Sequence, residues 1–177
     1  MEKAKRKKTK IVLLGIGTNK GNRKKNISLA LKLLSENPDI KLLKISKMLK
    51  NPPQEGIKSG YFLNGAVKLL TSLSPIELFK YCKKIEKKQG RIQSKDKKKK
   101  SRTIDLDILF YGNKILKTRE LTIPHPLLHK RYFVMIPLME IAPDFRHPVF
   151  EKKVRAIHEL SLHSDKHKKL GKCCIEV

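Results

Sequence analysis

The sequence of 177 residues contains no tryptophan, only three cysteines and few aromatic side chains. The cysteines, Cys82, Cys173 and Cys174, are too few for a disulfide framework, and none has the spacing of metal ligands. This usage is typical of a reducing compartment, so we expect a cytoplasmic protein. No apolar run approaches the ~20 residues that span a bilayer, and the basic start lacks the apolar stretch of a signal peptide. We therefore expect no membrane partner.

Acidic residues are also scarce: 16 Asp and Glu face 42 Lys and Arg, which gives a formal net charge of +26. Such a charge attracts polyanions such as nucleotides, nucleic acid or an acidic membrane surface, but it does not choose among them. With 39% hydrophobic residues, the chain can still bury a core. We expect a basic extension over 1–9, one domain over 10–150, and a basic tail over 151–177 that packs on or extends that domain.

Hydrophobic periodicity and turn signals predict the order strand, helix, strand, strand, helix, strand. The predicted strands lie within 10–19, which ends in a glycine-rich turn, at 40–50 and 61–73, and within 101–110, and the helices at 23–37 and 74–90. This is the order of the split βαβ, or ferredoxin-like, arrangement. We therefore predict an α+β fold with a βαββαβ core, an α/β sandwich around a central, mainly antiparallel sheet. A short strand pair, a turn at Pro124 and an apolar helix follow.

Turn and cap residues fix the ends of two of these elements. Ser74 at the N-cap, Pro75 in the first turn and Glu77 completing a capping box predict the start of the second helix, and Gly90 its end. The segment GIGTNKGN has neither the G-x-G-x-x-G spacing nor the Lys-Ser/Thr of a P-loop. We expect its glycines to form a tight strand-to-helix turn. They are Gly15, Gly17 and Gly21.

The segment SRTIDLDILF, residues 101–110, places two aspartates in a predicted strand, where Asp is depleted. Alternation puts Asp105, Asp107 and Leu109 on one face. The other face receives the apolar side chains Ile104, Leu106, Ile108 and Phe110. The aspartates lie ~7 Å apart at the backbone and can converge on Mg²⁺, which takes one or two carboxylates and fills its remaining positions with water and phosphate oxygens. A solvated sheet face is the alternative.

Basic groups near this strand favour the magnesium interpretation. Arg102 precedes the aspartates, Arg91 follows the second helix, and the segment PHPLLHKR adds His125 and Arg131. Carboxylates for magnesium, with Arg and His for phosphate, are the groups that phosphoryl transfer requires. Each of these residues alone would more often have a structural role, so the prediction rests on the set.

Two aromatic clusters and one amide indicate a site for a flat heterocycle. Tyr61 and Phe62 follow a Pro- and Gly-containing loop, and Tyr132 and Phe133 follow Arg131. One ring from each cluster could clamp a heterocycle, with the amide of Asn64 as donor and acceptor at its edge. The alternative is that these rings belong to the core.

The assembled motifs resemble the 6-hydroxymethyl-7,8-dihydropterin pyrophosphokinases, enzymes of the folate pathway. The match is collinear from about Ile11 to Phe150 and rests on six blocks: GIGTNKGN, NPPQEG with YFLNGAV, IEKKQGR, RTIDLDILFYG, LTIPHPLLHKRYF and PLMEIAPD. The resemblance implies a ferredoxin-like domain that transfers pyrophosphate from MgATP to the pterin hydroxymethyl group and releases AMP. We expect a monomer.

The resemblance assigns roles to individual residues. Asp105 and Asp107 match the ligands of two magnesium ions, and the implied catalytic set is Arg102, Asp105, Asp107 and His125. The implied ATP contacts are Glu86, Arg91, Arg102, His125 and Arg131. Phe62 and Phe133 match the rings that stack on the pterin, and Asn64 matches the amide that reads its edge. Pro52 and Gln54 fall on the pocket loop.

The sequence departs from the family pattern in two places. Between Arg91 and Arg102 the family usually has a second Arg, an aromatic residue and Gly-Pro, whereas this chain has Gln93 and four consecutive lysines. Lysine supplies charge but not a stacked ring or a bidentate fork, so we predict weaker or more salt-sensitive ATP binding. Asn51 stands where the family usually has Thr beside the pterin.

Two other functions are compatible with parts of the sequence. A basic ferredoxin-like module could bind single-stranded nucleic acid, but that function calls for aromatic residues on the central strands, where this chain carries an acidic pair. A degenerate relative could bind pterin or ATP without turnover; the altered loop favours it and the intact Asp, His and Arg set opposes it. Non-specific polyanion binding by the lysines is compatible with each function.

Overall fold

The computed structural model describes residues 8–52, 60–90, 102–163 and 175–176. Its elements in chain order are β1 (Lys10–Thr18), α1 (Arg23–Ser35), β2 (Ile40–Ile45), β3 (Met48–Asn51), β4 (Phe62–Thr71), α2 (Pro75–Lys88), β5 (Asp105–Tyr111), β6 (Leu116–Lys117), β7 (Thr122–Ile123), a 3₁₀ turn (Leu128–Lys130), α3 (Tyr132–Ile141), α4 (Val154–His163) and β8 (Ile175–Glu176).

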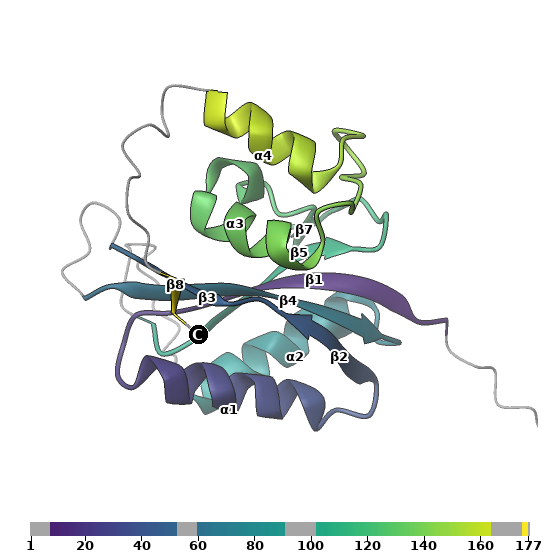
Figure 1. Ribbon diagram of the computed structural model, residues 1–177. Helices are drawn as coiled ribbons and strands as arrows, with labels where there is room; N and C mark the ends of the chain where they lie inside the picture. Colours follow the sequence, from purple (N-terminus) through teal and green to yellow (C-terminus); the bar gives the residue numbers. More distant parts are fainter. Residues whose placement is uncertain (1–7, 53–59, 91–101, 164–174, 177) are drawn as a thin grey trace, which may run out of the picture.

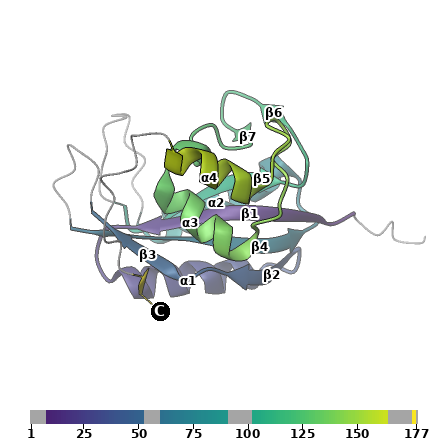
Figure 2. The ribbon, with the colours of Figure 1, turned by 45° about the horizontal axis from the view of Figure 1, so that its top comes forward.

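The main sheet has the strand order β5-β1-β4-β3-β8, and β2 also pairs with β4. All pairings between its described strands are antiparallel. Helices α1 and α2 cover one face, whereas α3 and α4 lie over the other (Figure 1). The separate two-stranded pair of β6 and β7 lies next to β5, which β7 contacts (Figure 2). The predicted α+β class and the βαββαβ order are confirmed.

The two faces of the sheet support separate hydrophobic cores. Val12 and Leu14 of β1 pack with Leu34 of α1 and Leu78 of α2. Leu13, on the opposite face of β1, packs in the second core, whose other members include Leu128, Met135, Leu138, Val154 and Ile157. Burial on both faces explains why the middle of β1 reads as a continuous apolar run and not as an alternation. Through Val154 and Ile157, α4 joins this second core and packs against α3 (Figure 1).

The predicted strand over 40–50 is divided into β2 and β3, both paired with β4. Ser46 lies at the break, where its backbone N–H donates to the carbonyl of Ala66 and its hydroxyl accepts from the Ala66 N–H, at 2.8 Å. The side chain therefore takes over one bond of the strand ladder, and the backbone bends at this point.

A register shift corrects the predicted faces of β5. Leu13 pairs with Phe110, but Leu14 pairs with Ile108, so Leu109 is the extra residue of a β-bulge. Leu109 and Phe110 consequently both lie in the second core, and the assignment of Phe110 to the face of Leu106 is wrong. The faces predicted for residues 104–108 are unaffected, because the bulge lies after them.

The ends of α2 agree with the sequence, but the glycine-rich turn does not. The Ser74 hydroxyl accepts from the Glu77 N–H and the Glu77 carboxylate accepts from the Ser74 N–H, which confirms the capping box. Gly21, with φ of +67°, lies in the turn before α1. Gly15 and Gly17, however, lie within β1, and the turn predicted for them is wrong. Among the described residues, no helix has the length and apolar character needed to cross a membrane.

Candidate active site

A cavity of about 230 Å³ opens on the face of the sheet that α3 covers. Strands β1, β4 and β5 form its floor, and the start of α3 forms part of its wall. Eight of the residues that we predicted for the site line it: Phe62, Asn64, Arg102, Asp105, Asp107, His125, Arg131 and Phe133. Residues separated by up to 71 positions in the sequence are thus gathered around one space.

Two glycines of β1 make room for this cavity. Gly17 pairs with Asp105 on one side and with Asn64 on the other, while Gly15 pairs with Asp107 and Ala66. A Cβ atom at Gly17 would lie 2.5 Å from Oδ1 of Asn64, closer than any real contact. The absence of side chains in the middle strand therefore leaves the aspartates of β5 and the amide of β4 facing the same open floor.

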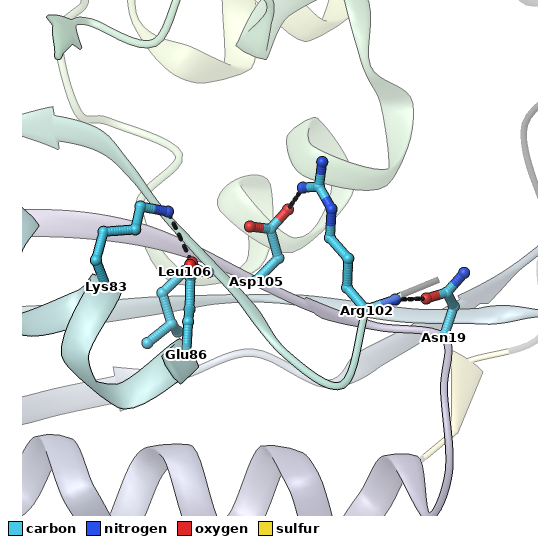
Figure 3. Close-up of polar contacts among 6 residues, drawn as sticks. All are labelled: Asn19, Lys83, Glu86, Arg102, Asp105 and Leu106. Atoms are coloured by element: carbon cyan, nitrogen blue, oxygen red, sulfur yellow. Dashed lines mark hydrogen bonds and ion pairs between the residues drawn. The ribbon is translucent and has the colours of Figure 1, made fainter. Parts of the chain in front are cut away.

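Asp105 and Asp107 form the acidic part of the cavity. Asp105 makes an ion pair with the Arg102 guanidinium (Figure 3). Burial raises the pKa of Asp107, and the negative charge of Asp105 raises it further, against the opposing effects of Lys83, His125 and Arg102. Two carboxylates whose charges are incompletely balanced favour the arrival of a cation.

The end of β1 positions Arg102. Its backbone N–H donates to Oδ1 of Asn19 at 2.6 Å (Figure 3), and the Asn19 N–H donates back to the Arg102 carbonyl at 3.1 Å. The hydroxyl of Thr18 donates to the next carbonyl, that of Thr103, at 2.6 Å. These bonds fix the backbone that leads into β5. Neither Thr18 nor Asn19 was among the predicted site residues.

His125 lines the cavity with one ring nitrogen already bonded to the backbone. Its Nδ1 accepts from the backbone N–H of Leu127 at 3.2 Å, so in the neutral ring the proton resides on Nε2. Burial lowers the pKa of His125, despite the opposing charge of Asp107. Its backbone N–H donates to the Leu109 carbonyl at 3.0 Å, which ties this loop to the bulge of β5. A ring fixed in this way can donate to a phosphate oxygen.

Arg131 and Phe133 come from the beginning of α3. Arg131 is the N-cap residue of that helix, and its guanidinium carbon lies 5.9 Å from the centre of the Phe133 ring. A helix N-terminus with an arginine attracts anions. Phe62, from β4, lines the same cavity, so both predicted stacking rings border one space. A group suited to bind phosphate, Arg131, therefore lies next to the two rings that could stack on a flat heterocycle.

Other predicted residues lie elsewhere. Glu86 is 2% exposed and does not line the cavity; its Oε1 accepts from the Leu106 N–H at 2.9 Å and from Nζ of Lys83 at 2.8 Å (Figure 3). Burial raises the pKa of Glu86. The carboxylate thus binds the outer edge of β5, the strand that carries the aspartates. Pro52 is exposed outside the lining, and Gln54 and Arg91 lie outside the described residues.

Lys83 was not among the predicted site residues, and Asn51 was noted only as a change from the Thr that the family usually has beside the pterin. Lys83 reaches Glu86 three positions along α2, a spacing that could have indicated an ion pair. Its effect on the pKa of Asp107 depends on the packing of α2 beside β5, which no local pattern gives. Asn51 lines the cavity beside Asn64 and is almost fully buried.

The acidic residues fit magnesium that arrives with a phosphate ligand. Among the described residues, no group of three or more His, Cys, Asp and Glu side chains forms a metal site by itself. Mg²⁺, however, usually takes one or two protein carboxylates and completes its octahedron with water and substrate phosphates. Asp105 and Asp107 supply that number and type of donor.

Known proteins are similar to this chain in sequence and in fold. Residues 13–143 match the family model of 7,8-dihydro-6-hydroxymethylpterin-pyrophosphokinase (HPPK). The chain is 40% identical over 145 residues to the 2-amino-4-hydroxy-6-hydroxymethyldihydropteridine pyrophosphokinase of Aquifex aeolicus, a match that covers 81% of this chain and 88% of that protein. It is also 40% identical over 138 residues to folic acid synthesis protein FOL1 of Dictyostelium discoideum, covering 78% of this chain and 20% of FOL1.

The chain thus spans a fifth of the length of FOL1. Among solved structures, Plasmodium falciparum HPPK-DHPS with pteroate superposes with a TM-score of 0.65 over 89% of this chain and 43% of that one. At 16% identity, this likeness concerns the fold. The family match, by contrast, includes the strands, loops and helix starts that form the cavity. The chain belongs to the 7,8-dihydro-6-hydroxymethylpterin-pyrophosphokinase (HPPK) family.

Proposed function

We propose that the protein transfers pyrophosphate from ATP to 6-hydroxymethyl-7,8-dihydropterin, releasing AMP, as a step of folate biosynthesis. The main observation behind the proposal is that one cavity has groups suited to bind phosphate on one side and aromatic rings suited to stack on a flat heterocycle on the other. The phosphate half contains Arg102, His125 and Arg131, and the pterin half contains Phe62 and Phe133. Membership of the HPPK family supports this reaction over a role as a nucleic-acid-binding module.

In the proposed reaction, the hydroxymethyl oxygen attacks the β-phosphorus of ATP. The bond from that phosphorus to the bridging oxygen of the α-phosphate breaks, AMP leaves with the oxygen, and the hydroxyl proton passes to solvent. Arg102, Arg131 and His125 hold the phosphates in line and stabilise the developing charge. We assign no general base, because positioning and charge stabilisation account for most of the catalysis in such transfers.

Asp105 and Asp107 would hold the magnesium that accompanies ATP, and we propose two ions. When bound, magnesium neutralises phosphate charge. The ion pair with Arg102 orients Asp105, and Glu86 supports both aspartates by binding the edge of β5. We propose that Glu86 acts on ATP binding indirectly, by holding the strand that carries the two aspartates. Arg91 is proposed as a direct ATP contact on the basis of the family pattern alone.

The pterin would lie between Phe62 and Phe133, with its edge against Asn64. Stacking between two aromatic faces suits a flat heterocycle. At Gly17 the amide oxygen of Asn64 lies over the backbone of β1, so the edge of the ring would meet that oxygen at this point of the floor. Pro52 and Gln54 belong to the loop that borders this half.

Product analysis tests the proposal. Wild-type protein with MgATP should form AMP only when 6-hydroxymethyl-7,8-dihydropterin is present, as measured by chromatography of the nucleotides. ADP in place of AMP would contradict pyrophosphate transfer. Binding of ATP and pterin with no AMP formed would instead identify a degenerate, non-catalytic relative.

The double variant Asp105→Ala/Asp107→Ala separates this site from general charge effects. It should lose magnesium-dependent ATP binding. Because the net charge of +26 is spread over the chain, binding of a polyanion such as heparin should persist. If the variant lost heparin binding together with ATP binding, the two ligands would not be held by separate parts of the protein, which would contradict this account. We further infer a cytoplasmic location, supported by the buried free thiol of Cys82 and by the cysteine usage of the sequence. That the protein is a monomer stays a prediction.

A further inference from the structure

We propose that Asn51 determines ring specificity by fixing the direction in which the Asn64 amide faces the substrate. This inference rests on the proposed pterin site. It concerns a residue that stands where the family usually has Thr beside the pterin, and it assigns to that residue an effect on Asn64. The geometry that supports it is a chain of two hydrogen bonds that begins at a backbone carbonyl.

Asn51 ends β3, directly beside the cavity. It is 3% exposed, and its neighbour in the sheet is Phe62, one of the two proposed stacking residues. The Nδ2 group of Asn64 donates to Oδ1 of Asn51 at 2.5 Å. The Asn51 amide thus contacts the amide proposed to read the ring, and both side chains line the same space.

The direction of the Asn51 amide is itself fixed. Its Nδ2 group donates to the carbonyl of Pro52 at 3.1 Å. A backbone carbonyl only accepts, so this bond requires nitrogen on that side of Asn51 and oxygen on the side of Asn64. If Asn64 alone were reversed, two amide oxygens would face each other in a buried place, which is strongly unfavourable. The Pro52 carbonyl therefore sets the polarity of both amides.

With this polarity, Asn64 presents an acceptor over the floor of the cavity. Its Oδ1 lies 2.5 Å from the position that a Cβ atom of residue 17 would occupy, so the oxygen projects across Gly17. The pyrimidinone edge of a pterin carries an amino group, which only donates. In a ring with an oxo group at that place, the oxo oxygen would face Oδ1 of Asn64, and neither of these two acceptors could donate a hydrogen bond. The site should accordingly select 2-amino over 2-oxo rings.

Two substitutions separate polarity from packing. Asn51→Thr retains a hydrogen-bonding group, but a hydroxyl donates or accepts with equal ease and no longer imposes a direction on Asn64. Asn51→Leu has a similar size and removes the bond. Calorimetry would give the Kd of each protein for 6-hydroxymethyl-7,8-dihydropterin and for its 2-oxo analogue, with thermal unfolding as a check of folding.

We expect wild-type protein to prefer the amino ring by roughly a hundredfold, since a polar site rejects a mismatched partner strongly. In Asn51→Thr the preference should fall about tenfold while pterin affinity stays within about threefold, the scale of one altered hydrogen bond. Asn51→Leu should lose both affinity and preference. The Kd for MgATP should be unchanged in each, which a general structural defect would not allow.

An unchanged preference in a folded Asn51→Thr variant would overturn the inference, as would equal affinity of the wild type for the two rings. If Asn51→Leu does not fold, the wild type and Asn51→Thr still decide the question. Because the readout is binding, it is separate from turnover. A wild type that discriminates between the rings but forms no AMP would contradict the proposed function and leave the role of Asn51 standing.

Discussion

Asp105 on β5 is the register partner of Gly17 on β1, and this pairing joins the two halves of the candidate active site. On its other side, Gly17 pairs with Asn64 of β4. A strand residue without a side chain therefore separates a carboxylate proposed for the phosphates from the amide proposed for the pterin. The distance across one antiparallel strand pair on each side is ~5 Å, so both groups can reach a single substrate pair.

Gly17→Ala should damage the pterin half of the site and spare the fold. The new Cβ would lie 2.5 Å from Oδ1 of Asn64, at the end of a side chain that can rotate away. We expect the KM for the pterin to rise by about tenfold or more, on the scale of a lost buried hydrogen bond, and the Kd for MgATP to change little. Steady-state kinetics with each substrate varied in turn would measure this difference.

Gly15→Ala is the matched control on the same strand. A Cβ at that position would contact the Leu109 side chain at 3.5 Å, an ordinary van der Waals distance. Because this Cβ would contact no atom of Asn64, we expect pterin affinity to fall less than in Gly17→Ala. Equal losses in the two variants would mean that β1 tolerates no methyl group at all, and would contradict the specific role of Gly17.

Asp107→Asn should abolish turnover while keeping the shape of the site. The amide has nearly the volume of the carboxylate but no negative charge, so magnesium and the nucleotide phosphates lose a principal contact. We expect activity to fall by about a hundredfold or more, as for other lost electrostatic contacts in active sites. Asp144→Asn is the control, because Asp144 lies at the surface, paired with Lys153 and Arg155. Its activity should equal that of the wild type.

Glu86→Gln should destabilise the protein. The buried carboxylate accepts from both the Leu106 N–H and Lys83, and an amide leaves the lysine without a charged partner at that place. We expect the free energy of unfolding to fall by about 1–3 kcal/mol, as measured by denaturant titration. Glu36→Gln, which loses an exposed pair with Lys32, should cost less than about 0.5 kcal/mol. Similar costs for both would contradict a structural role of Glu86 at the edge of β5.

His147 should make the fold sensitive to mild acid. It is 3% exposed, its Nδ1 accepts from the N–H groups of Val149 and Phe150, and its ring stacks on Phe150 at 4.1 Å. Burial lowers its pKa from 6.5 to about 4. Between these values the unfolded chain binds more protons than the folded one, so stability falls as the pH drops from 6.5 to about 4, by at most about 3 kcal/mol.

The variant His147→Asn isolates this effect. The asparagine oxygen can accept the same two backbone N–H groups but has no proton to gain in this range. The difference in unfolding free energy between the two proteins should therefore shrink as the pH falls from 6.5 to about 4. A difference that stays constant with pH would show that His147 does not cause the acid sensitivity.

Local sequence signals predicted much of the fold. The caps of α2, the alternation at Asp105 and Asp107, and the order of the main elements depend on neighbouring residues, and they agree with the structure. The bulge at Leu109 could not be predicted this way, since it arises from the register between β1 and β5. For the same reason Phe110 was placed on the wrong face.

The motifs predicted which residues meet in the site, but not the tertiary contacts that hold them in place. Gly15 and Gly17 were interpreted as turn residues because glycine is most often needed there, whereas their effect here is to keep a sheet face open. The bond between Asn51 and Asn64 joins two strands, and the bond of Glu86 to β5 joins a helix to a strand. Such contacts depend on tertiary packing, which a single sequence does not display.

The fate of each phosphate of ATP tests the central claim most directly. Wild-type protein would be incubated with 6-hydroxymethyl-7,8-dihydropterin and ATP labelled at the α-, β- or γ-phosphate in separate reactions. Pyrophosphate transfer predicts that β and γ labels move together to the pterin and that the α label stays in AMP. Transfer of the γ label alone, with release of ADP, would contradict the account.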